Sequence, residues 1–344
     1  MKISKNFSSM ITSLLKLMVI ILIIPFKALS FEIGVSMHID AYPKSTEYYI
    51  NLVKGLGITS VRNDYLWSQL EQQKKNFSVS SKQMKSTQLF SSTDQKKFTG
   101  LLILGYGNKN YNGGDYPRNK KDINDFLDYT RQVVFKFKGK VKYYEVWNEW
   151  YQGTSMGRFS KHKPSGKEYA DFVKLVSAEI KKIDPESVVL AGGFNPYDHK
   201  QVLWFSGLVK NGILNYVDGV SIHPYSYYRG DDYRKADFNI SKIQDFHNDF
   251  IKKGIDFPIY ITEFGVPNGG GEESYSEYDS AQFISEYIRE AKATDFIKGI
   301  WFYDLIDDGN NPFDYENNFG LFRKDETPKE VIQVMKDLNF KGVK

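Results

Sequence analysis

The chain has 344 residues, with 46 Lys and Arg against 42 Asp and Glu, and a formal net charge of +4. Four of the lysines lie in the first 30 residues, so the rest of the chain is neutral and lacks the concentrated basic composition typical of nucleic-acid-binding proteins. Cysteine is absent, which excludes disulfides and the usual structural zinc sites, so the fold must be stabilised by its buried core.

The first 30 residues have the pattern of a secretory signal peptide. Lysines at positions 2, 5 and 16 precede an uncharged apolar stretch, residues 17–26, and the sequence Ala28-Leu29-Ser30 follows. The apolar stretch is shorter than the ~20 residues that a membrane-spanning helix needs, so a permanent anchor is the weaker alternative. We therefore expect cleavage after Ser30 and an exported protein in the periplasm, at the cell surface or in the medium, with no stable membrane insertion.

Residues 31–344 alternate between strand-like runs of about six residues and helical stretches, which is the pattern of repeated βα units around a parallel sheet. Eight such strands in a chain somewhat longer than the ~250 residues typical of the fold predict an α/β protein with a single (β/α)8 TIM barrel over this range. A doubly wound open sheet is the alternative. The expected strands are Glu32–His38, Ile58–Asn63, Gly100–Tyr106, Val141–Trp147, Ser187–Gly192, Gly219–His223, Pro258–Glu263 and Lys298–Asp304.

Helix boundaries support this alternation. Ser165 and Glu168 form a capping box that predicts the start of a helix, and Asp184-Pro185 ends it. Thr327-Pro328 predicts the N-terminus of a final helix. The polar stretch 72–97 is expected to hold a helix or a loop.

Two of the expected strands end in a glutamate. The fourth leads into Trp147-Asn148-Glu149-Trp150, and the seventh leads into Thr262-Glu263-Phe264-Gly265. In a barrel of this kind the active site lies at the carboxyl ends of the strands, where these two side chains can converge. Because a pair of carboxylates is the machinery of glycoside hydrolysis, the sequence predicts a sugar-cleaving enzyme.

The segments Tyr144–Glu149 and Ile259–Gly265 resemble the strand-four and strand-seven motifs of clan A glycoside hydrolases. The resemblance implies a retaining mechanism with Glu149 as the acid/base, Glu263 as the nucleophile and Asn148 as the partner of the substrate 2-hydroxyl. It covers almost all of residues 31–344, which it identifies as the catalytic domain. It also implies that Arg62, His223 and Tyr225 surround the nucleophile and that Trp301 stacks on a sugar.

Within the clan, Leu104–Asn108 and Gly113–Pro117 are most similar to family 39, which includes bacterial glycosidases associated with exopolysaccharide and biofilm gene clusters. Tyr106 and Asn108 are therefore expected to bind substrate. The β-sandwich that accompanies the barrel in the β-xylosidases of this family has no counterpart, so we expect an endo-acting enzyme on a long polysaccharide.

Other aromatic and polar residues are predicted from their positions alone. Trp67 and Trp150 lie beyond strand ends, where exposed aromatic side chains bind sugar faces, and His38 at the end of the first strand is a substrate or supporting group. The run Gly269–Gly271 is expected to let a loop move over the cleft.

The histidines show no metal-binding spacing, and no cofactor is expected. Two alternatives remain open at this point. One is a carbohydrate-binding or polysaccharide-export accessory protein without catalysis, and the other is a cellulase-like or mannanase-like endo-hydrolase of a neighbouring family.

Overall fold

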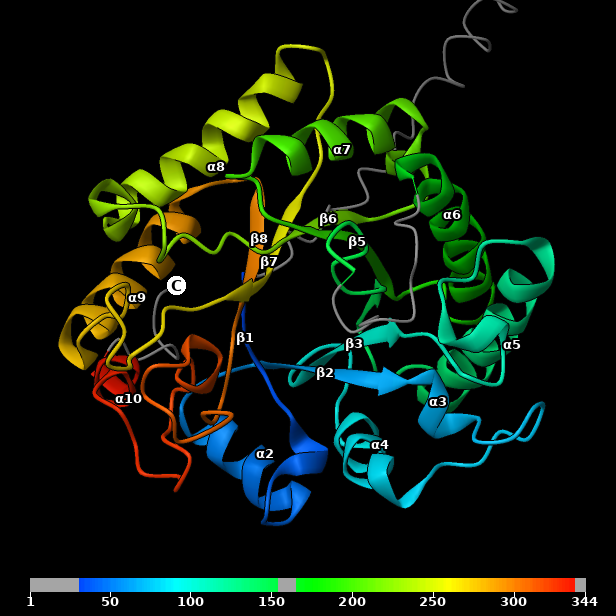
Figure 1. The fold of residues 1–344 in the computed structure, drawn as a ribbon, viewed down its shortest axis with the longest axis horizontal. Coiled ribbons are helices and arrows are strands. Elements are labelled where there is room, and N and C mark those ends of the chain that lie inside the picture. The colour runs from blue at the N-terminus through cyan, green and yellow to red at the C-terminus, as the bar shows by residue number, and fades with distance from the viewer. Residues whose placement is uncertain (1–30, 154–164, 338–344) are drawn as a thin grey trace, which may run out of the picture. The chain divides into compact units, whose positions relative to one another are not determined.

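The computed structural model describes residues 31–153 and 165–337, so the predicted signal segment lies outside the described residues. Parallel strands form a closed barrel in chain order, and β1 pairs with β8 (Figure 1). This closure confirms the predicted (β/α)8 barrel and excludes the open sheet. The strands are β1 Glu32–Ser36, β2 Ser60–Leu66, β3 Thr99–Gly105, β4 Tyr143–Val146, β5 Val188–Phe194, β6 Gly219–Ile222, β7 Ile259–Phe264 and β8 Ile297–Phe302.

Helices surround the barrel (Figure 1). The predicted capping box is present: Ser165 accepts a hydrogen bond from the Glu168 backbone and begins α6. None of the described helices is long and apolar enough to cross a membrane. The α-helices are α2 Thr46–Gly55, α3 Trp67–Leu70, α4 Met84–Ser91, α5 Lys120–Phe137, α6 Gly166–Ile183, α7 His199–Lys210, α8 Ala236–Ile251, α9 Glu277–Ala293 and α10 Val331–Asp337.

Short 3-10 helices lie in the connecting loops. The polar stretch 72–97 contains one of them together with α4. The 3-10 helices are η1 Ile39–Ala41, η2 Ser81–Gln83, η3 Asn112–Gly114, η5 Ile213–Asn215, η6 Asp231–Arg234 and η7 Tyr315–Asn317.

The barrel interior is filled by a small cluster of buried side chains that includes Tyr143, Tyr260 and Trp301. The Trp301 ring lies against Gly34, where a Cβ atom would come within 2.1 Å of it, and its indole nitrogen donates to Ser60 Oγ at 2.9 Å. Trp301 is fully buried, so the expectation that it stacks on a sugar is wrong. Because the interior is packed, any substrate must bind above it, at the carboxyl ends of the strands.

Candidate active site

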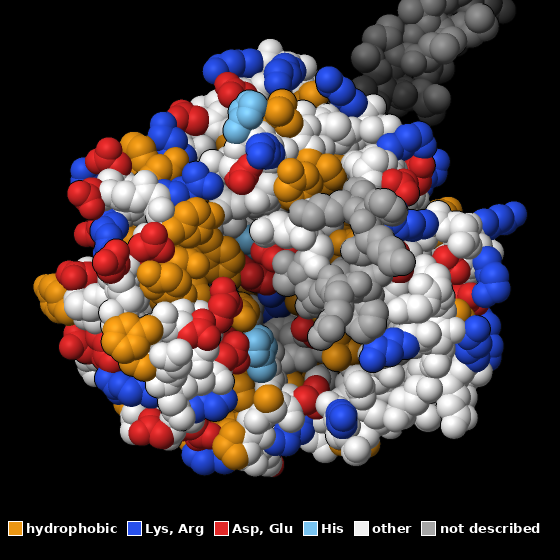
Figure 2. Space-filling view, in the orientation of Figure 1, with side chains coloured by type: hydrophobic (Ala, Val, Ile, Leu, Met, Phe, Trp, Pro, Cys, Tyr) orange, Lys and Arg blue, Asp and Glu red, His pale blue; other side chains and the backbone are white. Residues whose placement is uncertain are grey.

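A cavity of about 540 Å³ opens at the carboxyl ends of the strands, at the central hollow that Figure 2 shows. Its lining comes from the segments that follow most of the strands. The predicted site residues that line it are His38, Arg62, Tyr106, Asn148, Glu149, His223, Tyr225 and Glu263.

Glu263, at the end of β7, is held by two donors. Arg62 donates to its Oε1 at 2.8 Å and the Tyr225 hydroxyl donates to its Oε2 at 2.9 Å. Arg62 also donates to Glu145 at 3.0 Å and to Asn148 Oδ1 at 2.9 Å. Burial alone would lower the pKa of Arg62, but Glu145 and Glu263 outweigh it and raise that pKa, so Arg62 is a permanent cation. The guanidinium thereby fixes the positions of three side chains at once.

Glu149 lies on the opposite side of the cavity, after β4. Its Oε1 lies 3.1 Å from Nδ1 of His223. An oxygen of Glu149, an oxygen of Glu263 and a His223 nitrogen all lie within 4.8 Å of one another. This spacing fits the roughly 5–5.5 Å separation of carboxyl groups in retaining glycosidases, and it is too short for the roughly 6.5–9.5 Å of inverting ones.

The tautomer of His223 follows from its neighbours. The Thr262 hydroxyl donates to Glu145 Oε1 at 2.9 Å, so it must accept from Nε2 of His223, which lies 3.0 Å away. Nδ1 is then left to share a proton with Glu149. Burial lowers the pKa of His223, but the charge of Glu263 and the contact with Glu149 outweigh it, so the net shift is upward. The imidazole is thus oriented to hold a proton at the Glu149 carboxyl.

The backbone around Glu149 is locally strained. Trp147 and Glu149 have φ values of 68° and 46°, a region that residues other than glycine enter rarely. Gly193, at a bulge in β5 with φ of +57°, lies beside this turn, and a Cβ atom there would come within 3.0 Å of the Glu149 backbone nitrogen. The close approach explains why glycine occupies position 193.

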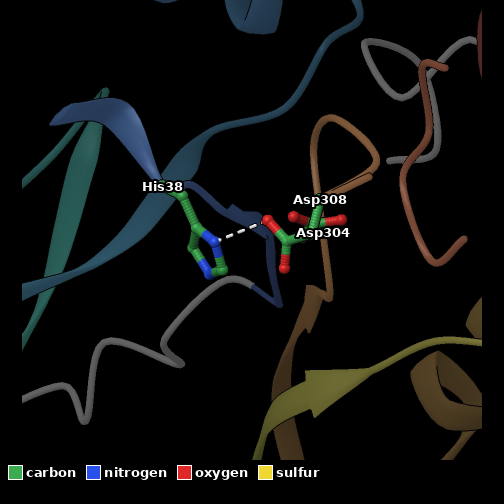
Figure 3. Close-up of side chains that lie close together, drawn as sticks. All are labelled: His38, Asp304 and Asp308. Carbon is green, nitrogen blue, oxygen red and sulfur yellow. Dashed lines mark hydrogen bonds and ion pairs between the residues drawn. The ribbon is translucent and has the colours of Figure 1, made fainter. Parts of the chain in front are cut away.

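His38, after β1, forms a second polar cluster at the cavity (Figure 3). Its Nδ1 lies 2.9 Å from Asp308 Oδ1, and an oxygen of the buried Asp304 lies nearby. Burial alone would lower the pKa of His38, but the hydrogen bond to Asp308 and the nearby carboxylates raise it to about 9. Burial raises the pKa of Asp304 well above its usual range. His38 is therefore an imidazolium at neutral pH.

The cluster of His38, Asp304 and Asp308 has the donor atoms that a divalent ion would need, and so does the cluster of Glu149, His223 and Glu263. Neither cluster could be predicted from the spacing of residues in the sequence, because each combines residues from distant segments. The expectation of no metal stays a prediction.

Two tryptophans expected at the surface are buried. Trp67 and Trp150 are each 1% exposed. Trp67 donates to Glu71 at 2.7 Å and stacks on Tyr111, whereas Trp150 stacks on Phe172. The prediction that they bind sugar is wrong, because aromatic side chains of α5, α6 and the loop after β3 pack against them.

Asn108 also lies away from the cavity. It is 2% exposed and donates to the backbone oxygen of Glu71 at 2.9 Å, so it supports a loop instead of binding substrate.

Several cavity residues were not predicted. Tyr303 follows β8, and its ring packs edge-on against His38, with centroids 5.8 Å apart, and against Phe319. Tyr303 is two residues beyond Trp301, so it is the aromatic side chain that strand eight presents to the cavity. Other unpredicted lining residues include Asp64 on β2 and a set of loop residues that carry no sequence signal of their own. The loop residues are Gln152, Asn195, Tyr227, Tyr228, Glu316 and Phe319.

A closed barrel with two facing carboxyl groups at this spacing is the arrangement expected from the resemblance to clan A glycoside hydrolases. The sequence model of the cellulase family, glycosyl hydrolase family 5, matches residues 27–302. The chain belongs to this family.

A curated relative, endo-1,4-beta-xylanase B of Thermotoga neapolitana, is 28% identical over 162 residues, which are 44% of this chain and 42% of the xylanase. Among solved structures, a family 39 glycoside hydrolase from Bacteroides cellulosilyticus WH2 has a TM-score of 0.71 at 19% identity and covers 90% of this chain. The matched part is 63% of that enzyme, so the chain spans less than two thirds of both relatives.

Xylanase 10B from Thermotoga maritima has a TM-score of 0.64 at 18% identity and covers 91% of this chain and 96% of its own. At these identities the solved structures demonstrate a shared fold.

Proposed function

We propose that this protein is an endo-acting retaining glycosidase that cleaves a bacterial exopolysaccharide or a related β-linked polysaccharide. The observation that carries the proposal is the placement of the Glu149 and Glu263 oxygens within 4.8 Å, one held by His223 and the other by Arg62 and Tyr225. The family match, the cellulase name of that family and the endo-xylanase relative support action on a polysaccharide.

In the first step Glu263 is the nucleophile. Its carboxylate attacks the anomeric carbon, a bond forms between that carbon and the Glu263 oxygen, and the glycosidic bond breaks. Glu149 donates its proton to the departing oxygen. Arg62 and Tyr225 orient the Glu263 carboxylate by donating to one oxygen each, and Asn148, held by Arg62, is placed to meet the 2-hydroxyl of the sugar.

In the second step Glu149 acts as a base. It takes a proton from water, the water oxygen attacks the anomeric carbon, and the bond to Glu263 breaks. His223 remains bonded to Thr262 and Glu149 throughout and can stabilise each protonation state of Glu149 by sharing the proton at Nδ1. The sugar in the cavity would contact His38 and Tyr106 and would stack on Tyr303.

The remaining parts of the proposal concern location. Residues 1–30 would direct export and be removed, and residues 31–344 would form the catalytic domain. The substrate would then be a polymer met outside the cytoplasm.

The test is hydrolysis of a panel of polysaccharides by wild type and by Glu263→Gln. The panel contains xylan, mixed-linkage β-glucan, glucomannan and an extracted bacterial exopolysaccharide, and the readouts are released reducing ends and fragment size. We expect wild type alone to release oligosaccharides from at least one polymer, with a loss of roughly 10⁴-fold or more in the variant. Equal release by both proteins would refute the role of Glu263, and binding without release would favour a carbohydrate-binding protein.

A further inference from the structure

The glycine run after β7 supports aromatic side chains from the loop after β8. A Cβ atom on Gly270 would lie 3.2 Å from the Phe313 ring, and one on Gly271 would lie 2.5 Å from the Tyr315 ring. The two loops are also joined by backbone hydrogen bonds, from Gly270 to Pro312 at 2.7 Å among others. The glycines therefore let these rings pack closely on the backbone, which is a different role from the loop movement expected above.

We define an outer platform as Tyr227, Tyr228, Phe313, Tyr315 and Phe319. Ring contacts join four of these side chains, and Phe313 lies on Gly270, next to the glycine that Tyr315 covers. Within it, Tyr227 contacts Tyr228, Tyr315 and Phe319, with ring centroids 5.0, 5.4 and 5.6 Å apart.

The outer platform begins at the catalytic cavity. Phe319 contacts Tyr225, which donates to Glu263, and it contacts Tyr303 as well, each at a centroid distance of 5.7 Å. Phe319, Tyr227 and Tyr228 themselves line the cavity. The platform is thus an extension of the surface on which the reacting sugar lies.

The far end of the platform is open to solvent. Phe313, at this end, is 74% exposed, and Tyr228, beside the cavity, is 45% exposed. Figure 2 shows hydrophobic side chains gathered along one rim of the central hollow, beside acidic ones. Exposed apolar area next to a cleft marks a binding surface, and flat aromatic rings suit the C–H faces of pyranose rings.

We propose that the outer platform binds sugar units of the polysaccharide chain beyond the unit at the catalytic carboxyls. This inference rests on the proposed function and deepens it. A surface beyond the catalytic carboxyls can contact a polysaccharide chain, whereas a single sugar with a small leaving group would not reach it. The occupant is an uninterrupted glycan chain that leaves the cavity past Phe319 and Tyr227 and reaches Phe313.

The experiment measures retardation of the Glu263→Gln protein during native electrophoresis in gels that contain each polymer of the panel above. Phe313→Ala and Tyr315→Ala are introduced into this background, with Tyr315→Phe as the variant that keeps the ring. The matched control is Phe135→Ala on α5, because Phe135 is 76% exposed and does not line the cavity. Thermal melting of each variant shows whether it is folded.

We expect one polymer to retard Glu263→Gln. We expect the apparent dissociation constant to rise about tenfold in each platform alanine variant, which corresponds to the loss of about 1.4 kcal/mol of stacking. Tyr315→Phe and Phe135→Ala should bind like the parent. Equal retardation of all variants, or no retardation of the parent in any gel, would overturn the platform. Reducing-end release by wild type is measured separately, so failure of the platform is distinguishable from failure of the hydrolase.

Discussion

The floor and the rim of the cavity are built in different ways. At the floor, Arg62, Glu145 and Glu263 are each less than 10% exposed and their polar atoms are joined by hydrogen bonds. At the rim, Tyr228 and Phe313 are 45% and 74% exposed, and they pack on the Tyr227 ring and on Gly270 respectively. The floor comes from strand ends, whereas the rim comes from the loops after β6 and β8.

This difference separates chemistry from recognition. The barrel backbone fixes the strand ends, so groups that must lie within a fraction of an ångström of a productive geometry belong on the floor. Aromatic stacking tolerates small displacements, so it can be supplied by loops. Changes on the floor should therefore impair catalysis or folding, and changes on the rim should alter polymer binding.

The largest effect on activity is expected from a change to Glu149, the floor residue that protonates the glycosidic oxygen. Glu149→Gln cannot donate a proton, so kcat/KM for an aryl glycoside with a poor leaving group should fall roughly 10²–10⁴-fold. A dinitrophenyl glycoside needs no protonation to leave, so its first step should proceed and the glycosyl-enzyme should accumulate as a burst. An equal loss for both substrates would show that Glu149 is not the acid.

A second change tests whether the floor also stabilises the fold. Arg62→Met leaves Glu145 and Glu263 buried without their cation, and the free energy of unfolding should fall by about 3–5 kcal/mol. Tyr228→Ala on the rim should change it by less than about 0.5 kcal/mol. Urea denaturation of both variants measures the contrast, and comparable losses would remove the distinction between floor and rim.

Sequence reasoning succeeded on the floor for a physical reason. Parallel strands present their carboxyl ends at one edge, so glutamates at the ends of two strands could be placed together without coordinates. Arg62 and His223 were expected beside them from the resemblance to clan A. Glu145 was visible as a carboxylate within an apolar strand, but its bonds to Arg62 and Thr262 depend on which face of β4 it occupies.

The rim was not predictable in this way, because loop paths depend on long-range packing. Trp67 and Trp150 were expected at the surface, yet aromatic side chains from distant segments bury them. Phe313 and Tyr315 lie on Gly270 and Gly271, which are more than 40 residues earlier in the chain. The sequence prediction also chose the wrong aromatic side chain near strand eight for sugar stacking. Trp301 lies in the barrel interior, and Tyr303 lines the cavity.

A smaller effect should come from the backbone behind Glu149. Gly193→Ala adds a Cβ atom 3.0 Å from the Glu149 nitrogen at a φ of +57°, so the turn must shift. A displacement of a few tenths of an ångström at the acid should lower kcat by roughly 10–100-fold. The control is Gly207→Ala in α7, where a Cβ atom meets no neighbour and activity should be unchanged. Wild-type activity of Gly193→Ala would mean that the turn is not strained.

The smallest effect concerns His38, whose side chain is 39% exposed. Its pKa is raised from 6.5 to about 9 in the folded protein, so its interaction stabilises the fold fully below about pH 6.5 and is lost as pH rises through 9. Asp308→Asn removes the main bond that raises this pKa. Because the pair is solvent-screened, the variant should lose only about 0.5–1 kcal/mol at pH 6, and the difference from wild type should shrink by pH 9.5. His223 is present in both proteins, so its own titration cancels from the comparison. Urea denaturation at pH 6, 7.5 and 9.5 measures the difference. A difference that does not change with pH would show that Asp308 contacts His38 without raising its pKa.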